Sequence, residues 1–323
     1  MNALNERYSP LSVRQRYEVW FLRLALADGS GAWWFRYLLL NPGRGGCITP
    51  SNSALADNEY RAMPVQIWAT WFPRNGRPET VIQGFSLKDA DFSERGKTPF
   101  HFHVGPNIIQ EASCRGELVV NAHRVSWDLR YRSNFQCTLS NKGWVGFSRT
   151  PHSDAVFSGR ITLDGHVFEG DPLGFGLQGH NCGYRHRGYW RWAHAYFPRS
   201  DGNATTIEAL IYDMPLGLVF RKAVLWHEGR HYAFRNVKEI ARGADEFQWK
   251  FQCSKKNQLT VEAFFDGTGP EIHRLPYLKT DCSGNFEVTN NSLSRATLHL
   301  KRGDQVQQLS TEGGAVLEMA GRR

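Results

Sequence analysis

The chain repeats one local pattern almost from end to end: short runs in which apolar and polar residues alternate, separated by turn residues. Runs over 19–26 and 33–40 flank the turn 28–31, and runs over 65–72 and 79–85 flank a second turn. A period of two places successive side chains on opposite faces of a β-strand. The pattern therefore predicts antiparallel hairpins.

The same rhythm continues through the second half of the chain. Asp164-Gly165 stands between runs over 157–163 and 166–169 and is a strong signal for a two-residue hairpin turn. The segment 141–153 lacks clear alternation and is predicted to be looser. Amphipathic helical patterns are nearly absent, and further strands are predicted at 117–120, 123–132, 204–212, 218–226, 230–237, 246–253, 258–265, 286–290 and 296–302.

Length and composition suggest how these strands are grouped. At 323 residues, with 41% apolar and 13% aromatic content, the chain is long enough for about two domains with sizeable cores. Many short strands with little helix indicate an all-β fold of barrels or sandwiches. We predict two β domains, residues 1–150 and 151–323, packed closely together because no low-complexity linker separates them.

Charge and cysteine content narrow the partners and the compartment. The start of the chain lacks a secretory pattern, and the apolar run 19–27 is broken by Arg23 and too short to span a bilayer. Six separated cysteines without a C-x-x-C pair indicate free thiols in a reducing compartment. We expect a cytoplasmic protein whose net charge of +8 permits loose association with a membrane surface, and no obligate protein partner.

Three motif-like stretches have simpler interpretations. Gly174, Gly176 and Gly179 spell G-x-G-x-x-G, but a strand and not a helix follows, so nucleotide binding is not favoured. Residues 227–231 spell H-E-x-x-H, but their flanks alternate like strands and predict a hairpin, not a zinc-binding helix. His101-Phe102-His103 lacks a third ligand nearby. We therefore predict neither a metal nor another cofactor.

Residues 171–197, DPLGFGLQGHNCGYRHRGYWRWAHAYF, join a glycine-rich turn, a His-Asn pair and an aromatic strand. Trp190, Trp192 and His194 fall at a period of two, so they share one strand face. That face could be ordinary β-core. An aromatic face beside His180 and Asn181 also suits a groove for an apolar ligand with one reactive point.

Part of this region resembles a known family. The hairpin 157–169, then Gly179-His180-Asn181-Cys182-Gly183, and then the Trp-Arg-Trp of 190–192 resemble the tocopherol cyclase-like and carotenoid 1,2-hydratase-like group, also called the AttH/CrtC type. That group has a G-x-I-x-x-D-G hairpin, a (D/E)-(H/K)-N-W-G signature and a tryptophan-rich strand. This chain departs from the signature at Cys182, which replaces tryptophan, and at Gly179, which replaces the acidic or charged residue.

The resemblance implies two lipocalin-like β-barrels or curved sheets, with a site for a prenyl-type or polyene hydrophobic molecule between or inside them. Known members of the group close a chromanol ring, hydrate a carotenoid alkene or accelerate cycloadditions. Their common requirement is an apolar cavity with few polar groups. The implied activity is acid-catalysed cyclisation or hydration of an alkene without a cofactor.

A mechanism of this type needs a neutral acid, because an alkene is a weak base, and an aromatic wall that tolerates the cation. Relatives of the hydratase type carry a Tyr and an Asp near the place of Tyr212 and Asp213. We predict Asp213 as the proton donor, His180 as its partner or proton acceptor, and Asn181 as the orienting group. The substrate-binding residues are predicted to be Tyr212, Tyr184, Trp190, Trp192 and His194.

Other readings of these residues stay open. Asp213 precedes Met-Pro and could be a turn residue that bonds nearby backbone. The loss of the signature tryptophan at Cys182 favours a protein that binds a lipophilic molecule without converting it. A pericyclase that needs no acid is a further alternative. Arginines among aromatics are also found in nucleic-acid binders, but we do not expect that partner.

Overall fold

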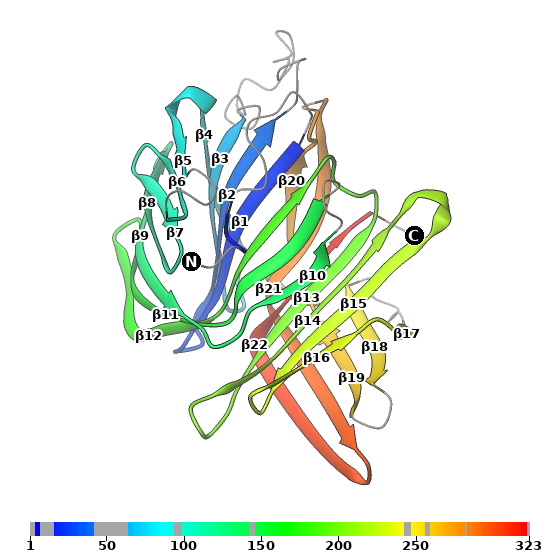
Figure 1. Cartoon of the computed structure of the whole chain (residues 1–323). Helices are drawn as coiled ribbons and strands as arrows, with labels where there is room; N and C mark the ends of the chain where they lie inside the picture. The colour runs from blue at the N-terminus through cyan, green and yellow to red at the C-terminus, as the bar shows by residue number, and fades with distance from the viewer. Residues whose placement is uncertain are drawn as a thin grey trace.

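The computed structural model describes residues 4–6, 16–41, 64–93, 99–141, 146–241, 247–255, 259–281 and 283–321. Within these ranges the chain is almost entirely antiparallel β-strand, arranged in two curled sheets (Figure 1). Each sheet forms a nearly closed barrel, so the predicted all-β fold with two lipocalin-like barrels is confirmed.

The first barrel takes the N-terminal strands. The order in its sheet is β4-β3-β2-β1-β12-β11-β9-β8-β7-β6-β5, and β10 pairs with β11. A single-turn 3-10 helix, Leu87–Asp89, precedes β5. The strands are β1 (Arg16–Leu26), β2 (Gly31–Asn41), β3 (Val65–Pro73), β4 (Glu79–Phe85), β5 (Ala90–Phe92), β6 (His101–Val104), β7 (Asn107–Gln110), β8 (Ser113–Val120), β9 (His123–Arg132), β10 (Cys137–Asn141), β11 (Gly146–Leu163) and β12 (His166–Gly183).

The second barrel takes the C-terminal strands, in the order β16-β15-β14-β13-β22-β21-β19-β18-β17, with β20 paired to β21. A short 3-10 helix, Pro215–Gly217, joins β14 to β15. The strands are β13 (Trp190–Pro198), β14 (Ala204–Asp213), β15 (Val219–His227), β16 (Arg230–Phe234), β17 (Val237–Ala241), β18 (Gln248–Lys255), β19 (Leu259–Asp266), β20 (His273–Leu278), β21 (Asn285–Arg302) and β22 (Gln305–Ala320).

The two barrels repeat one topology. Each opens with a four-strand meander whose first strand pairs with the last strand of a long hairpin, β1 with β12 and β13 with β22. Each long hairpin carries one side strand, β10 on β11 and β20 on β21. The chain is therefore a structural repeat, and equivalent strands can be compared between the barrels.

The change from one sheet to the other lies between Gly183 and Trp190. The boundary predicted near residue 150 falls inside β11, which together with β12 completes the first barrel. The looser connection predicted for 141–153 is also wrong over 146–153, which belongs to β11. These residues are mostly buried on both faces, because some contact the second barrel, as Thr150 does at Glu208, and others the first, as His152 does at Ser133. Their pattern therefore does not alternate like that of a half-solvated strand.

Strand alternation builds one core inside each barrel and apolar packing between the barrels. On β1, Trp20, Leu22 and Leu24 point into the first barrel, whereas Val19 and Phe21 point outward and pack against the second barrel. On β13, the odd residues face the interior of the second barrel and the even residues face the first. The outer faces of the two barrels therefore share an apolar core.

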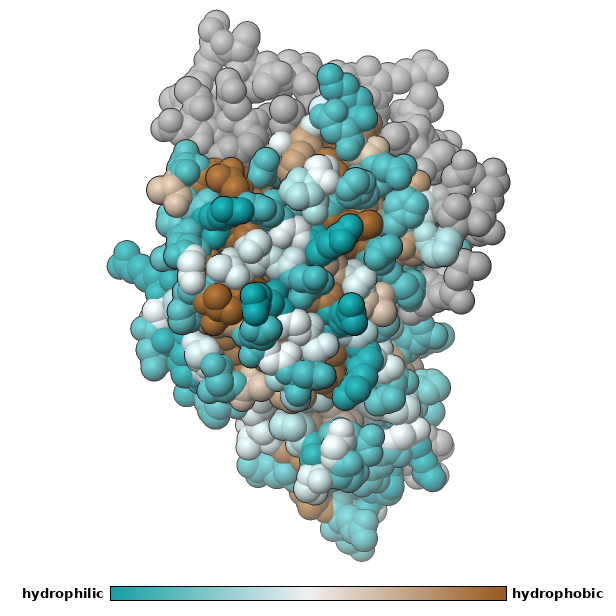
Figure 2. Space-filling view, turned by 90° about the vertical axis from the view of Figure 1, so that its left-hand side faces the viewer, coloured by the Kyte–Doolittle hydropathy of each residue, from teal (hydrophilic) through white to brown (hydrophobic). Residues whose placement is uncertain are grey.

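The remaining surface is largely hydrophilic on the face shown in Figure 2, where hydrophobic residues lie in small separate groups. Within the described residues, no helix combines the length and the apolar character that crossing a bilayer requires.

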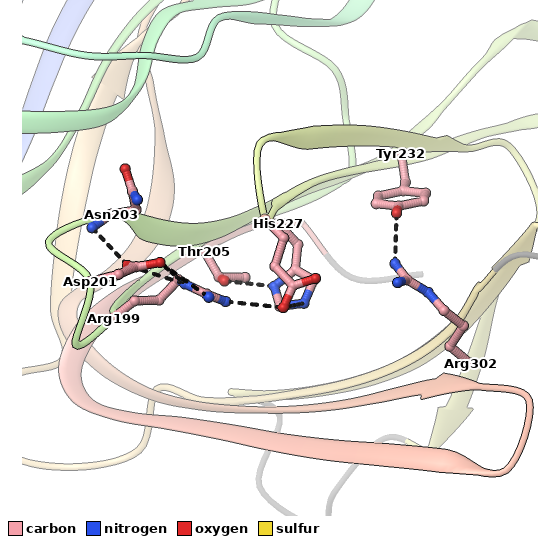
Figure 3. A network of polar contacts seen from close by, with 8 residues as sticks. Arg199, Asp201, Asn203, Thr205, His227, Tyr232 and Arg302 are labelled. Carbon is pink, nitrogen blue, oxygen red and sulfur yellow. Dashed lines mark hydrogen bonds and ion pairs between the residues drawn. The ribbon is translucent and has the colours of Figure 1, made fainter.

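The H-E-x-x-H stretch forms the predicted hairpin and not a helix. His227 pairs with Arg230 across a turn in which Glu228 and Gly229 have φ of 51° and 69°. The Nδ1 atom of His227 lies 2.8 Å from Thr205 Oγ1, in the polar network of Figure 3. The G-x-G-x-x-G stretch is likewise part of a strand, β12.

Candidate functional site

A cavity of about 300 Å³ lies between the two barrels. Its size is at the lower end of the range for small-molecule sites. The wall combines the outer faces of β1, β2, β13 and β14 with residues of β10, β12, β20 and β22. The aromatic lining residues are Tyr17, Phe21, Trp34, Phe147, Tyr184, Trp190, Trp192, Tyr212 and Tyr277.

Five of the predicted site residues line this cavity, namely Asn181, Tyr184, Trp190, Trp192 and Tyr212. The indole of Trp192 contacts Phe21 edge to face at 5.7 Å between centroids. The phenol of Tyr212 is hydrogen-bonded to Ser140 at 3.0 Å. The aromatic face that the period of two predicted therefore lies between the barrels. This is one of the two positions, between or inside the barrels, that the family resemblance implied for the site.

His180 does not line the cavity. It neighbours Asn181 on β12, so its side chain points to the opposite face, into the first barrel. It is fully buried, stacks on Trp20 at 4.6 Å, and its Nε2 lies 2.8 Å from Glu18 Oε1. The structure therefore does not bring His180 and Asn181 together at one site.

Asp213 also lies outside the wall. Tyr212 faces the cavity, so the next residue of β14 faces away, and Asp213 Oδ1 accepts a hydrogen bond from the backbone nitrogen of Tyr189 at 3.1 Å. This is the backbone-bonding role considered as the alternative. The described geometry does not place Asp213 where it could protonate a molecule in the cavity.

His194 shares the aromatic face, as predicted, but it is fully buried in the contact between the barrels and does not line the cavity. Its Nε2 donates to the carbonyl oxygen of Ser153 at 2.8 Å. Burial lowers the pKa of His194 to about 3, so the imidazole is neutral.

The carboxyl group in the wall is Glu318, a residue that we did not predict. It is 9% exposed. Its Oε1 accepts from Trp190 Nε1 at 3.1 Å, and its Oε2 accepts from the Tyr277 hydroxyl at 2.9 Å and from Asn290 Nδ2 at 3.3 Å. Glu318 is the single acidic residue in the strand stretch Ala315–Ala320, and a lone charge in an apolar strand is a signal that could have identified it.

Glu318 has the same position in the β13–β22 ladder as Gly179 has in the β1–β12 ladder of the other barrel. It lies opposite Trp192 in the β13–β22 ladder, as Gly179 lies opposite Phe21 in the β1–β12 ladder. A Cβ at Gly179 would lie 2.2 Å from the Phe21 ring, so a side chain there would require the ring to move. The acidic group that the family signature has before its His-Asn pair is thus absent from β12, and an acidic group stands at the matching place in β22.

A second buried carboxyl group, Glu208, lies beneath the wall. It is 1% exposed and accepts hydrogen bonds from Trp192 Nε1 at 2.8 Å, Thr150 Oγ1 at 2.6 Å and Cys137 Sγ at 3.2 Å. Burial raises its pKa. Glu208 is not among the residues that line the cavity, so its role is to hold Trp192 in place.

The cavity also contains basic groups. Arg36 lies directly beside Phe21 in the β1–β2 ladder and is 4% exposed. His186 is stacked on Tyr17 at 4.1 Å between centroids. The pKa of His186 is lowered to about 3, first by burial and then by the positive charge of Arg36.

Cys182 lies in the wall as a buried thiol, 3.9 Å from Arg16 Nη1. Burial raises the pKa of this thiol, so it is protonated at neutral pH. The aromatic surface that a tryptophan would supply here is provided by Trp34, Trp190 and Trp192.

Among the described residues, no three His, Cys, Asp or Glu side chains lie close enough together to hold a metal ion.

The fold and the site define a double lipocalin-like barrel with an aromatic cavity between the barrels. No protein-family profile and no curated sequence matches the chain. Solved structures do. Kievitone hydratase from Nectria haematococca superposes with a TM-score of 0.56 at 13% identity, over 99% of this chain and 91% of that one.

Two further structures share the architecture. CghA, solved with Sch210972, has a TM-score of 0.58 at 8% identity over 95% of this chain and 88% of that one. An AttH-type protein from Nitrosomonas europaea has a TM-score of 0.50 at 13% identity over 95% and 92%. The sequence-based resemblance is thereby confirmed at the level of the fold, which this chain shares with these three solved structures.

Proposed function

We propose that this protein is an enzyme that binds a prenyl-type hydrophobic molecule between its barrels and catalyses cyclisation or hydration of an alkene in it. The observation that carries the proposal is a cavity rich in aromatic residues in which Glu318 is the one carboxyl group among the described lining residues. Aromatic faces stabilise a carbocation, and a buried carboxyl group can deliver and recover a proton. The shared fold with a hydratase supports a related activity.

Glu318 takes the role that the sequence suggested for Asp213. In its protonated form it gives a proton to the less substituted alkene carbon, which leaves a tertiary carbocation and a carboxylate. A phenol oxygen of the substrate then bonds to the cation and closes a ring, or a water molecule bonds to it and yields a tertiary alcohol. In either case the oxygen loses a proton to the carboxylate of Glu318, which regenerates the acid.

The wall residues around Glu318 fit this role. Trp190 donates to the carboxyl group and also lines the cavity, so the indole positions the acid and presents its ring to the cation. Tyr277, which lies on β20, donates a hydrogen bond to the second carboxyl oxygen. Both contacts fix the direction of Glu318 within the wall.

The test is conversion of a 2-prenylphenol, followed by mass spectrometry. Ring closure keeps the mass and hydration adds one water. Glu318→Gln should abolish conversion and leave binding intact, while Asp213→Asn, the control, should convert the substrate as the natural protein does. Conversion that survives in Glu318→Gln, or that is lost in Asp213→Asn alone, would reject the assignment.

Binding without conversion is the second candidate. The observation that favours it is that both oxygens of Glu318 already accept hydrogen bonds from protein donors. A carboxyl group so engaged can be a structural part of the wall. Saturable binding of several prenylated phenols with no product from any of them would favour this function.

A further inference from the structure

Arg36 is a buried cation whose charge has no counter-ion among the residues that the structure describes. Its side chain is 4% exposed, and its Nη1 is buried without a hydrogen-bond partner. Its guanidinium instead lies over two rings, 3.8 Å from the centroid of Tyr277 and 4.7 Å from that of Trp68. Aromatic faces compensate only part of the cost of burying a charge.

Arg23, on the neighbouring strand β1, shows how this fold satisfies a buried guanidinium. It is fully buried and donates to four backbone carbonyl groups of the second barrel, those of Ser292, Gly313, Gly314 and Ala315. Arg23 is therefore structural. Arg36 has no such set of acceptors, although it is nearly as deeply buried.

The position of Arg36 explains the difference. It lines the cavity, so the missing acceptor could be supplied from the cavity itself. Glu318 accepts a hydrogen bond from the hydroxyl of Tyr277, whose ring lies against the guanidinium of Arg36, and forms no ion pair with Arg36 in the described structure. After burial, the positive charge of Arg36 is the second cause of the lowered pKa of His186, another lining residue.

We propose that Arg36 binds an oxyanion on the ligand, a carboxylate, phenolate or enolate oxygen, so that the ligand is a hydrophobic molecule with one acidic oxygen head group. This inference rests on the proposed function, since it concerns the same cavity and names the class of molecule that the cavity takes. A guanidinium pairs with such an oxygen through charge-assisted hydrogen bonds. The aromatic wall then holds the apolar remainder of the ligand.

The test compares farnesoic acid with methyl farnesoate, which have the same chain and differ in the charge of the head group. Binding is measured by quenching of tryptophan fluorescence, at a pH where the acid is ionised. The natural protein should bind the acid with an affinity at least about tenfold higher than its affinity for the ester. Arg36→Gln should lose that preference while its affinity for the ester stays within about twofold.

Two variants control the result. Arg132→Gln removes one positive charge from an exposed position on β9 and should keep the preference for the acid. Arg36→Met removes the buried charge altogether, and its thermal midpoint without ligand should equal or exceed that of the natural protein. A structural arginine would give a lower midpoint.

The outcomes separate this inference from the proposed function. If the ester binds as tightly as the acid, or if the preference survives in Arg36→Gln, the oxyanion site is wrong and the hydrophobic cavity stands. If neither compound binds, the proposed function and the oxyanion site are both overturned. A preference for the acid that disappears only in the Arg36 variants supports the site.

Discussion

Arg23 of the first barrel holds the backbone of Ser292 in the second, with Nε and Nη2 at 3.2 and 2.6 Å from the same carbonyl oxygen. The acceptor is free because the β21–β22 ladder shifts its register between Asn291 and Ser294, and a bulge releases backbone groups from the ladder. The irregularity of the hairpin thus supplies one of the contacts that join the two barrels.

The second barrel makes the reciprocal contact. His194, on the strand equivalent to that of Arg23, donates to the carbonyl of Ser153, which lies in a register shift of the β11–β12 ladder. Each barrel therefore sends a buried basic side chain from its first strand to a bulge in the long hairpin of the other. The cavity lies between the same outer faces.

Replacing Arg23 by methionine should destabilise the protein. The change removes the donors of four buried carbonyl groups, and we expect the free energy of unfolding to fall by about 3 kcal/mol. Urea unfolding measures the loss. Arg36→Met is the matched control, because it shortens an arginine of similar burial that has no carbonyl partners; equal losses in the two variants would contradict the distinction between them.

Acid should destabilise the contact at His194. Its pKa is about 6.5 in an unfolded chain and about 3 in the folded protein, so the unfolded state binds more protons between these values. Stability is complete above pH 6.5 and falls as the pH falls towards 3, by about 1.4 kcal/mol per unit from this residue. Urea unfolding at several pH values should give a smaller slope for His194→Gln, and an unchanged slope would refute the assignment.

The two tryptophans should differ in what they support. Trp192→Phe removes a donor to the buried Glu208 and should lower the free energy of unfolding by about 1–3 kcal/mol. Trp190→Phe removes a donor to Glu318 in the cavity wall and should act mainly on ligand binding and conversion. Chemical unfolding and titration with methyl farnesoate distinguish the two effects; the reverse pattern would show that Trp192, not Trp190, serves the site.

The hairpin tip between β14 and β15 should contact an anionic membrane surface. Leu216 and Leu218 are 96% and 59% exposed, and the tip is close to the cavity because Phe220 stacks on Tyr212 at 4.6 Å. Joint replacement of both leucines by serine should reduce co-sedimentation with vesicles that contain phosphatidylserine. Val306→Ser, at the exposed tip of β21–β22, should have no effect; equal retention of all variants would argue against this contact.

The period of two in the sequence determined most of the strands, the tight turn at Asp164-Gly165 and the shared face of Trp190 and Trp192. These are local properties, since a strand and its turn are specified by neighbouring residues. The resemblance carried by the hairpin and the His-Asn segment led to the right fold. The two-barrel architecture was accessible at this level, but the strand count was not, since no strand was predicted at β10, β20 or β22.

Only the tertiary structure decided which side chains meet. Strand alternation separates neighbours, so His180 and Asn181 face different cores, and Tyr212 and Asp213 do the same. Glu318 reaches Trp190 from 128 positions away because β22 returns to pair with β13. Whether a face becomes interior or exterior depends on how the sheet curls and which barrel packs on it, and no local pattern encodes that.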